Sequence, residues 1–169
     1  MNPSPQLSAL VMTLMIAAPA AAAAPQRLGN RPHFSWPLPK PHELVRPFIP
    51  PLTPYGPGHR GIDIAGWTDR PVLAAGDGRV IHAGPVVNRP LVSLEHPGGL
   101  RTTYEPVAPS VTRHQRVHRG DVIGHLMAGH CPTACLHWGA HRAGTYVDPR
   151  RLLSSGQVRL LPSPPITLS

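Results

Sequence analysis

Short apolar runs, separated by turn-forming sequences, fill the middle of this 169-residue chain. Sequences such as GDG, HPGG and HRGD stand between the runs and are typical of hairpin turns. No segment of ten or more residues shows a helical period. We therefore predict six strands, at Pro71–Ala75, Arg79–Ala83, Leu91–His96, Leu100–Glu105, Asp121–Leu126 and Cys135–Arg142.

The predicted strands are rich enough in apolar residues to form a shared core. Many short strands with frequent Gly and Pro favour an all-β fold of two packed antiparallel sheets. The apolar side chains that we expect in this core are Val72, Leu73, Val80, Ile81, Leu91, Val92, Leu94, Val122, Ile123, Leu136 and Trp138.

A proline-rich segment precedes the predicted sheets. Residues 25–57 include the sequences WPLPKP and RPFIPPLTP, which exclude a regular helix or a central strand. We expect an extended arm that lies over the domain and is fastened by Trp36 and Phe48.

The two ends of the chain differ from the middle. Residues 1–24 contain an apolar run from Leu7 to Ala18 and then an alanine-rich run, which resembles a secretory signal peptide without a basic residue at its start. The run is shorter than the roughly 20 residues of a spanning helix, so we expect no transmembrane helix in the mature protein, and a retained N-terminal anchor is the alternative. We expect residues 58–153 to form the folded domain and residues 154–169 to be disordered.

The charge is strongly positive. Fifteen of the sixteen basic residues are arginine, against eight acidic residues, and the formal net charge is +8. This excess could favour anionic polymers of the bacterial cell wall, or it could reflect a solvated surface rich in arginine. The arginines are dispersed and aromatic residues make up only 5% of the chain, which argues against nucleic acid as a partner.

The sequence GPGHRGIDIAG contains a pair of candidate metal ligands. His59 and Asp63 are four residues apart, so they lie on the same side of a strand, and the surrounding glycines and alternating isoleucines suggest a loop that enters a strand. His137, in the later sequence CLHWG, adds a second imidazole. Two imidazoles and one carboxylate are a ligand set that a catalytic zinc ion accepts while it keeps a fourth position for water.

Several sequence runs between Trp36 and Leu153 support the assignment of these metal ligands. They are GHRGIDIAG, RPVLAAGDGRVIHAGPV, LVSLEHPGGLRTTYEPV, HRGDVIGHLMAGH, CLHWGAHR and YVDPRRLL. On these runs the chain resembles the lysostaphin and LytM type of peptidoglycan metallopeptidase. The resemblance implies that His59, Asp63 and His137 bind Zn²⁺ and that peptidoglycan peptides are the substrate.

The chain departs from the family pattern at two positions. Peptide-cleaving members have a histidine in a Tyr-x-His-Leu run and another at the first position of HxH, where this chain has Pro106 and Cys135. We expect Glu105 and His141 to be the candidates that replace them, with Tyr104 as a possible oxyanion donor. His130, like His141, flanks the segment that carries His137.

The two cysteines, Cys131 and Cys135, are close in sequence. In an exported protein they are expected to form a disulfide that closes the loop before His137. Alternatively Cys135 binds zinc as a fourth ligand, because it has the same strand parity as His137, and such a closed site would be structural.

Two functions remain from these observations. The first is a secreted or cell-envelope zinc metalloendopeptidase that cleaves peptidoglycan peptides. The second is a degenerate member of the same family that binds the cell wall or regulates another wall hydrolase without cutting a bond.

Overall fold

The structure is a computed structural model that describes residues 33–53 and 56–153. Apart from a single 3-10 turn at Pro97–Gly99 and one short helix, the regular elements in these ranges are strands. They are β1 (Leu44–Arg46), β2 (Gly61–Ala65), β3 (Pro71–Leu73), β4 (Gly78–Val86), β5 (Arg89–His96), β6 (Leu100–Glu105), β7 (Val107–Pro109), β8 (Arg116–Val117), β9 (Val122–Leu126), β10 (Cys135–Arg142), β11 (Thr145–Val147) and the helix α1 (Arg150–Leu153).

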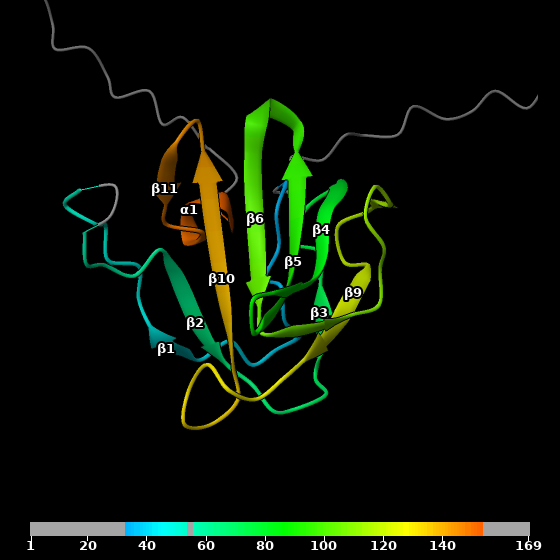
Figure 1. Cartoon of the computed structure of the whole chain (residues 1–169), viewed down its shortest axis with the longest axis horizontal. Helices are drawn as coiled ribbons and strands as arrows, with labels where there is room; N and C mark the ends of the chain where they lie inside the picture. The colour runs from blue at the N-terminus through cyan, green and yellow to red at the C-terminus, as the bar shows by residue number, and fades with distance from the viewer. Residues whose placement is uncertain (1–32, 54–55, 154–169) are drawn as a thin grey trace, which may run out of the picture.

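The strands form two antiparallel sheets, as the sequence predicts. The large sheet has the order β1-β2-β10-β6-β5-β4-β8, and β11 pairs with the far end of β10. The small sheet has the order β3-β9-β7. Figure 1 shows β10, β6 and β5 side by side in the middle of the large sheet, with β3 and β9 to one side.

The core lies between the sheets and follows from strand alternation. Ile62, Trp138, Tyr104 and Val92 are opposite one another on β2, β10, β6 and β5, and all four are fully buried. Because successive side chains point to opposite faces, the neighbouring residues on these strands face away from the core. Burying aromatic and branched side chains of this size contributes about 1.5–3 kcal/mol each.

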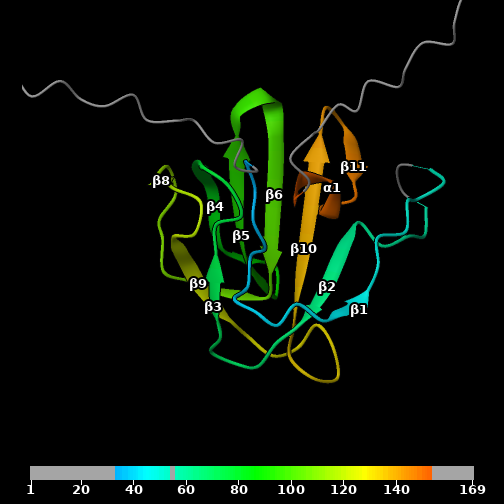
Figure 2. The same cartoon turned by 180° about the vertical axis from the view of Figure 1, so that it is seen from behind.

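The described part of the proline-rich segment is extended and adds an edge strand to the large sheet. Figure 2, seen from the side opposite to Figure 1, shows this segment, in blue and cyan, crossing in front of the sheet before it reaches β1, which pairs with β2. Trp36 and Phe48 pack against the core, as expected, and Leu38 is buried. The buried guanidinium of Arg70 also holds the segment, since it donates to the carbonyl oxygens of Pro39 and Pro41.

Some sequence predictions about strands and core residues are wrong in detail. Val122 is 46% exposed, because alternation along β9 turns its neighbour Ile123 into the core instead. Leu73 and Ile81 are only half-buried. The prediction also lacked four strands of two or three residues, β1, β7, β8 and β11, since so few residues show no period, whereas the equally short β3 lies within the predicted strand Pro71–Ala75.

The expected signal peptide and the expected disordered tail lie outside the described residues. Within the described ranges, no helix is long and apolar enough to cross a membrane.

Candidate metal centre

A row of polar side chains crosses the large sheet on the face opposite the core. Asp63 of β2 is paired with His137 of β10, and His137 is paired with Glu105 of β6. Paired residues on neighbouring strands point to the same side of a sheet, so the register brings these three groups together. Gly61 makes room for them, because a Cβ atom at this position would lie 2.6 Å from His137 Nε2.

His59 precedes β2 and is oriented by the proline-rich segment. A two-way backbone bridge joins His59 to Ile49, and the His59 Nδ1–H group donates to the carbonyl oxygen of Pro47 over 2.7 Å. A backbone acceptor of this kind fixes the tautomer of a ligating histidine and leaves its other nitrogen free. The His59 Nε2 atom therefore faces Asp63 with a lone pair.

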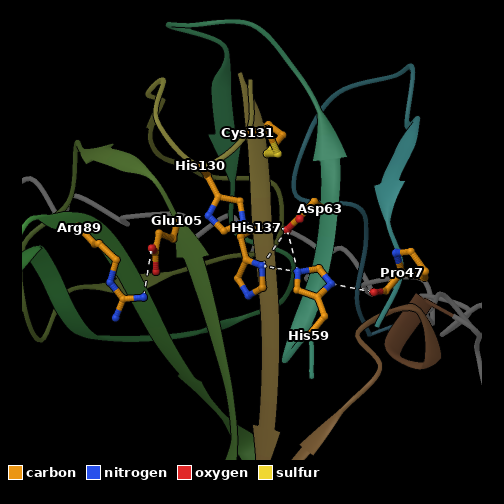
Figure 3. A network of polar contacts seen from close by, with 9 residues as sticks. Pro47, His59, Asp63, Arg89, Glu105, His130, Cys131 and His137 are labelled. Carbon is orange, nitrogen blue, oxygen red and sulfur yellow. Dashed lines mark hydrogen bonds and ion pairs between the residues drawn. A yellow bond between two sulfur atoms is a disulfide. The ribbon is translucent and has the colours of Figure 1, made fainter. Parts of the chain in front are cut away.

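The three predicted ligands meet at one point, as Figure 3 shows. The Asp63 Oδ1 atom lies 3.0 Å from His59 Nε2 and 2.8 Å from His137 Nδ1, and the two imidazole nitrogens are 3.0 Å apart. Asp63 is 2% exposed and His59 is 4% exposed. The three residues that the sequence analysis grouped as ligands are therefore in mutual contact in the fold.

Electrostatics in the cluster favour an ionised carboxylate. Burial raises the pKa of Asp63, but the hydrogen bond with His137 and the charges of His59, His137 and His130 when these rings are protonated outweigh it, so the pKa lies below the ordinary value of 3.8. An ionised carboxylate is the form that a metal binds.

The donor set fits a zinc ion. Because the Nδ1 hydrogen of His59 is directed to Pro47, a lone pair and an anionic oxygen face each other at 3.0 Å, an arrangement that is unfavourable unless a proton or a cation lies between them. A tetrahedral zinc site with bonds of about 2.0–2.1 Å has ligand atoms about 3.3 Å apart, close to the observed 2.8–3.0 Å. The residues and spacing are those that zinc accepts.

His130 also contributes to the cluster, although it was not among the predicted ligands. Its Nε2 atom lies 3.1 Å from Asp63 Oδ1, and its ring centre lies 5.1 Å from that of His137. The adjacent cysteine pair is the sequence feature that could have indicated a role for His130, because a disulfide brings the loop before β10 back toward His137.

Cys131 and Cys135 form a disulfide, which confirms that prediction. Both sulfurs lie near Asp63, within 4.8 Å of its carboxylate oxygen. A sulfur in a disulfide is not a thiolate, so the alternative of Cys135 as a fourth zinc ligand does not hold in this structure.

A groove of about 530 Å³ opens beside the cluster. His137 and Glu105 line it, and Glu105 is held by Arg89, whose Nη1 atom lies 3.5 Å from its carboxylate. His141 lines the same groove, further along β10, and packs edge-on against Tyr146. Three arginines, Arg60, Arg89 and Arg101, give the groove a positive wall.

The side chain of Tyr104 points into the core and away from the groove. Its hydroxyl accepts a hydrogen bond from the Ala75 N–H group and lies 2.9 Å from Thr102 Oγ1 in the core. Burial raises the pKa of Tyr104 to about 12. As the neighbour of Glu105 on β6, it must face away from the groove, so we do not retain it as an oxyanion donor.

A two-sheet β fold with a buried His-Asp-His cluster beside a groove is the architecture of a metallopeptidase-like domain. Residues 57–149 match the sequence profile of Peptidase family M23, and the chain belongs to this family. Over 160 residues it is 48% identical to the protein named "Uncharacterized protein Rv2891" from Mycobacterium tuberculosis. The match covers 90% of this chain but 61% of that protein, so the chain spans about three fifths of the curated relatives it matches.

Solved structures show the same fold. A zinc-containing peptidase from Vibrio cholerae superposes with a TM-score of 0.59 at 25% identity, over 72% of this chain and 40% of that one. The catalytic domain of lysostaphin from Staphylococcus simulans gives a TM-score of 0.58 at 24% identity, over 66% of this chain and 92% of that domain. The lysostaphin-like fold that the sequence predicts is therefore confirmed.

Proposed function

We propose that this protein is an exported zinc metallopeptidase that cleaves peptides of bacterial peptidoglycan, with His59, Asp63 and His137 as the zinc ligands. The observation that carries the proposal is the buried cluster of these three residues, which opens onto a groove in a member of a peptidase family. The similar peptidase from Vibrio cholerae contains zinc, which supports the choice of metal.

The groove offers a place for a peptide next to the metal. When bound at such a site, zinc lowers the pKa of a water and polarises a carbonyl group. Glu105 faces the groove beside His137, where its carboxylate can accept a proton from an attacking water, and Arg89 holds it in position. The arginines of the groove wall can pair with carboxylates of a cell-wall peptide.

His141 has a different place in this proposal. It lies four residues beyond His137 on β10, which corresponds to about 13 Å along a strand. At that distance it can contact the substrate in the groove but cannot reach the metal. We therefore assign His141 to peptide binding rather than to proton transfer.

A location outside the cytoplasmic membrane suits both the disulfide and a cell-wall substrate. A disulfide between Cys131 and Cys135 is stable in an oxidising environment, and residues 1–24 resemble a signal peptide. The net charge of +8 would favour contact with anionic wall polymers.

A second function, binding without cleavage, has specific support. The positions of the two family histidines hold Pro106, which has no proton acceptor, and Cys135, which is buried in the disulfide. Loss of a general base typically lowers the rate by about 10²–10⁴. A protein of this kind would bind wall peptides or regulate another hydrolase.

Release of new amino groups from purified peptidoglycan distinguishes the two functions. We expect slow release by the zinc-loaded protein, none by His59→Ala, and a large decrease for Glu105→Gln. Release that does not exceed that of His59→Ala would contradict hydrolysis and leave the binding function. Restoring the histidines with Pro106→His and Cys135→His, together with Cys131→Ser to avoid a lone thiol, should raise the rate.

A further inference from the structure

His130 is the fourth member of the cluster at the metal centre. His59, Asp63, His130 and His137 each offer one ligand atom, and all four atoms lie within 4.8 Å of one another. Figure 3 shows the His130 ring pointing from its loop toward Asp63 and His137. Its side chain is 28% exposed, whereas the side chains of His59 and Asp63 are almost fully buried.

We propose that His130 is a fourth protein ligand of the metal and that the Cys131–Cys135 disulfide holds it in place. The inference rests on the metal site of the proposed function, but it does not require hydrolysis. The His130 Nε2 atom is 3.1 Å from Asp63 Oδ1, which is as close as His59 Nε2 at 3.0 Å. A tetrahedral zinc ion has four positions, and a third imidazole can take the one that His59, Asp63 and His137 leave.

The disulfide explains how a residue on an exposed loop can hold this position. Cys131 is next to His130, and Cys135 begins β10 two residues before His137. The bridge therefore shortens the covalent path between the two histidines. Without it, the eight residues 127–134 between β9 and β10 would sample many more conformations, and ordering His130 at the metal would cost correspondingly more entropy.

This ligand set has a consequence for control of the site. Four protein ligands close the shell, whereas hydrolysis needs an open position. His130 is the most exposed of the four and lies on a loop, so it is the ligand that a substrate can displace. The disulfide then sets how firmly the site is closed.

Metal affinity tests the ligand assignment directly. In the full chain, competition with a chelating dye should show that His130→Ala weakens Zn²⁺ binding by at least about tenfold, because even partners outside the ligand shell contribute 10–100-fold. His130→Gln, which keeps a side chain of similar length, should show the same loss. The visible spectrum of the Co²⁺-loaded protein should change in both variants. His125→Ala, which removes a histidine on β9, is the matched control and should bind like the parent.

A double-mutant cycle tests the role of the disulfide. Cys131→Ser combined with Cys135→Ala removes the bridge without leaving a thiol that could bind metal. We expect this pair to weaken zinc binding, and we expect His130→Ala to cause little further loss in that background, since both changes remove one interaction.

Two results would overturn the inference. If His130→Ala binds zinc with the affinity of the parent and leaves the cobalt spectrum unchanged, His130 is not a ligand. If the loss from His130→Ala is equally large with and without the disulfide, the bridge does not hold it. A parent that needs His130 for metal binding but releases no amino groups from peptidoglycan would contradict only the proposed hydrolysis, whereas a parent that binds no zinc would contradict both proposals.

Discussion

The strands β2, β10 and β6 present two different rows of side chains on their two faces. Ile62, Trp138 and Tyr104 pack into the core, whereas their neighbours Asp63, His137 and Glu105 lie on the opposite face, where His137 and Glu105 line the groove. A shift of one residue along each strand separates the side chains that stabilise the fold from those that hold the site. We call the first set the core row and the second set the groove row. A substitution in the core row should lower the stability of the fold, whereas a substitution in the groove row should weaken metal binding.

The largest effect should come from the core row. Trp138→Ala removes a fully buried indole from the centre of the large sheet, and such changes cost about 3–5 kcal/mol of stability. Urea unfolding of the metal-free protein measures it. The adjacent His137→Ala should change the metal-free stability by far less. Equal losses in the two variants would show that the two rows are not separate.

The groove row should show the reverse pattern in metal binding. His137→Ala removes one of three predicted ligands and should weaken zinc binding by at least about a hundredfold, or about 2.7 kcal/mol. Metal analysis after gel filtration should find a zinc stoichiometry near zero. His82→Ala, which removes another half-buried histidine of the large sheet, serves as the control and should retain the metal of the parent.

The smallest effect concerns a histidine on the core side. His96 is 4% exposed and lies 2.8 Å from the Asp77 carbonyl oxygen and 2.7 Å from Thr102 Oγ1. Burial lowers its pKa, although the contact with Asp77 acts in the opposite direction. Below about pH 6.5 the unfolded chain takes up a proton at this residue more readily than the folded protein does. The stability gained from neutral His96 is therefore present above that pH and is lost as the pH falls through the folded value.

Urea midpoints of the metal-free protein at pH 7.5 and pH 5.5 measure this dependence. The parent should lose more stability on acidification than His96→Gln, whose side chain does not titrate. An identical loss in the two proteins would assign the acid sensitivity to other groups, such as the histidines of the metal centre.

The sequence could predict the fold class and three members of the cluster because both depend on local patterns. Turn sequences and apolar runs define the longer strands, and strand parity places Asp63 and Glu105 on definite sides of their own strands. The pairing of β2 with β10 joins residues 70 or more positions apart, so no local pattern contains it. For the same reason the direction of Tyr104 and the approach of His130 depended on register and on loop closure.

The carbonyl oxygen of Pro47, which fixes the ring of His59, lies outside the span of residues 57–149 that defines family membership. Every amino acid carries the same carbonyl group, so an exchange at this position would leave the chemistry of the acceptor intact as long as the backbone kept its path. An alignment of residue types therefore cannot reveal the hydrogen bond between His59 and the Pro47 carbonyl oxygen. A fragment trimmed to the family boundary would lose it, together with β1, and would expose the unpaired backbone edge of β2 to association with other chains. The smallest piece worth expressing is thus set by backbone geometry rather than by similarity.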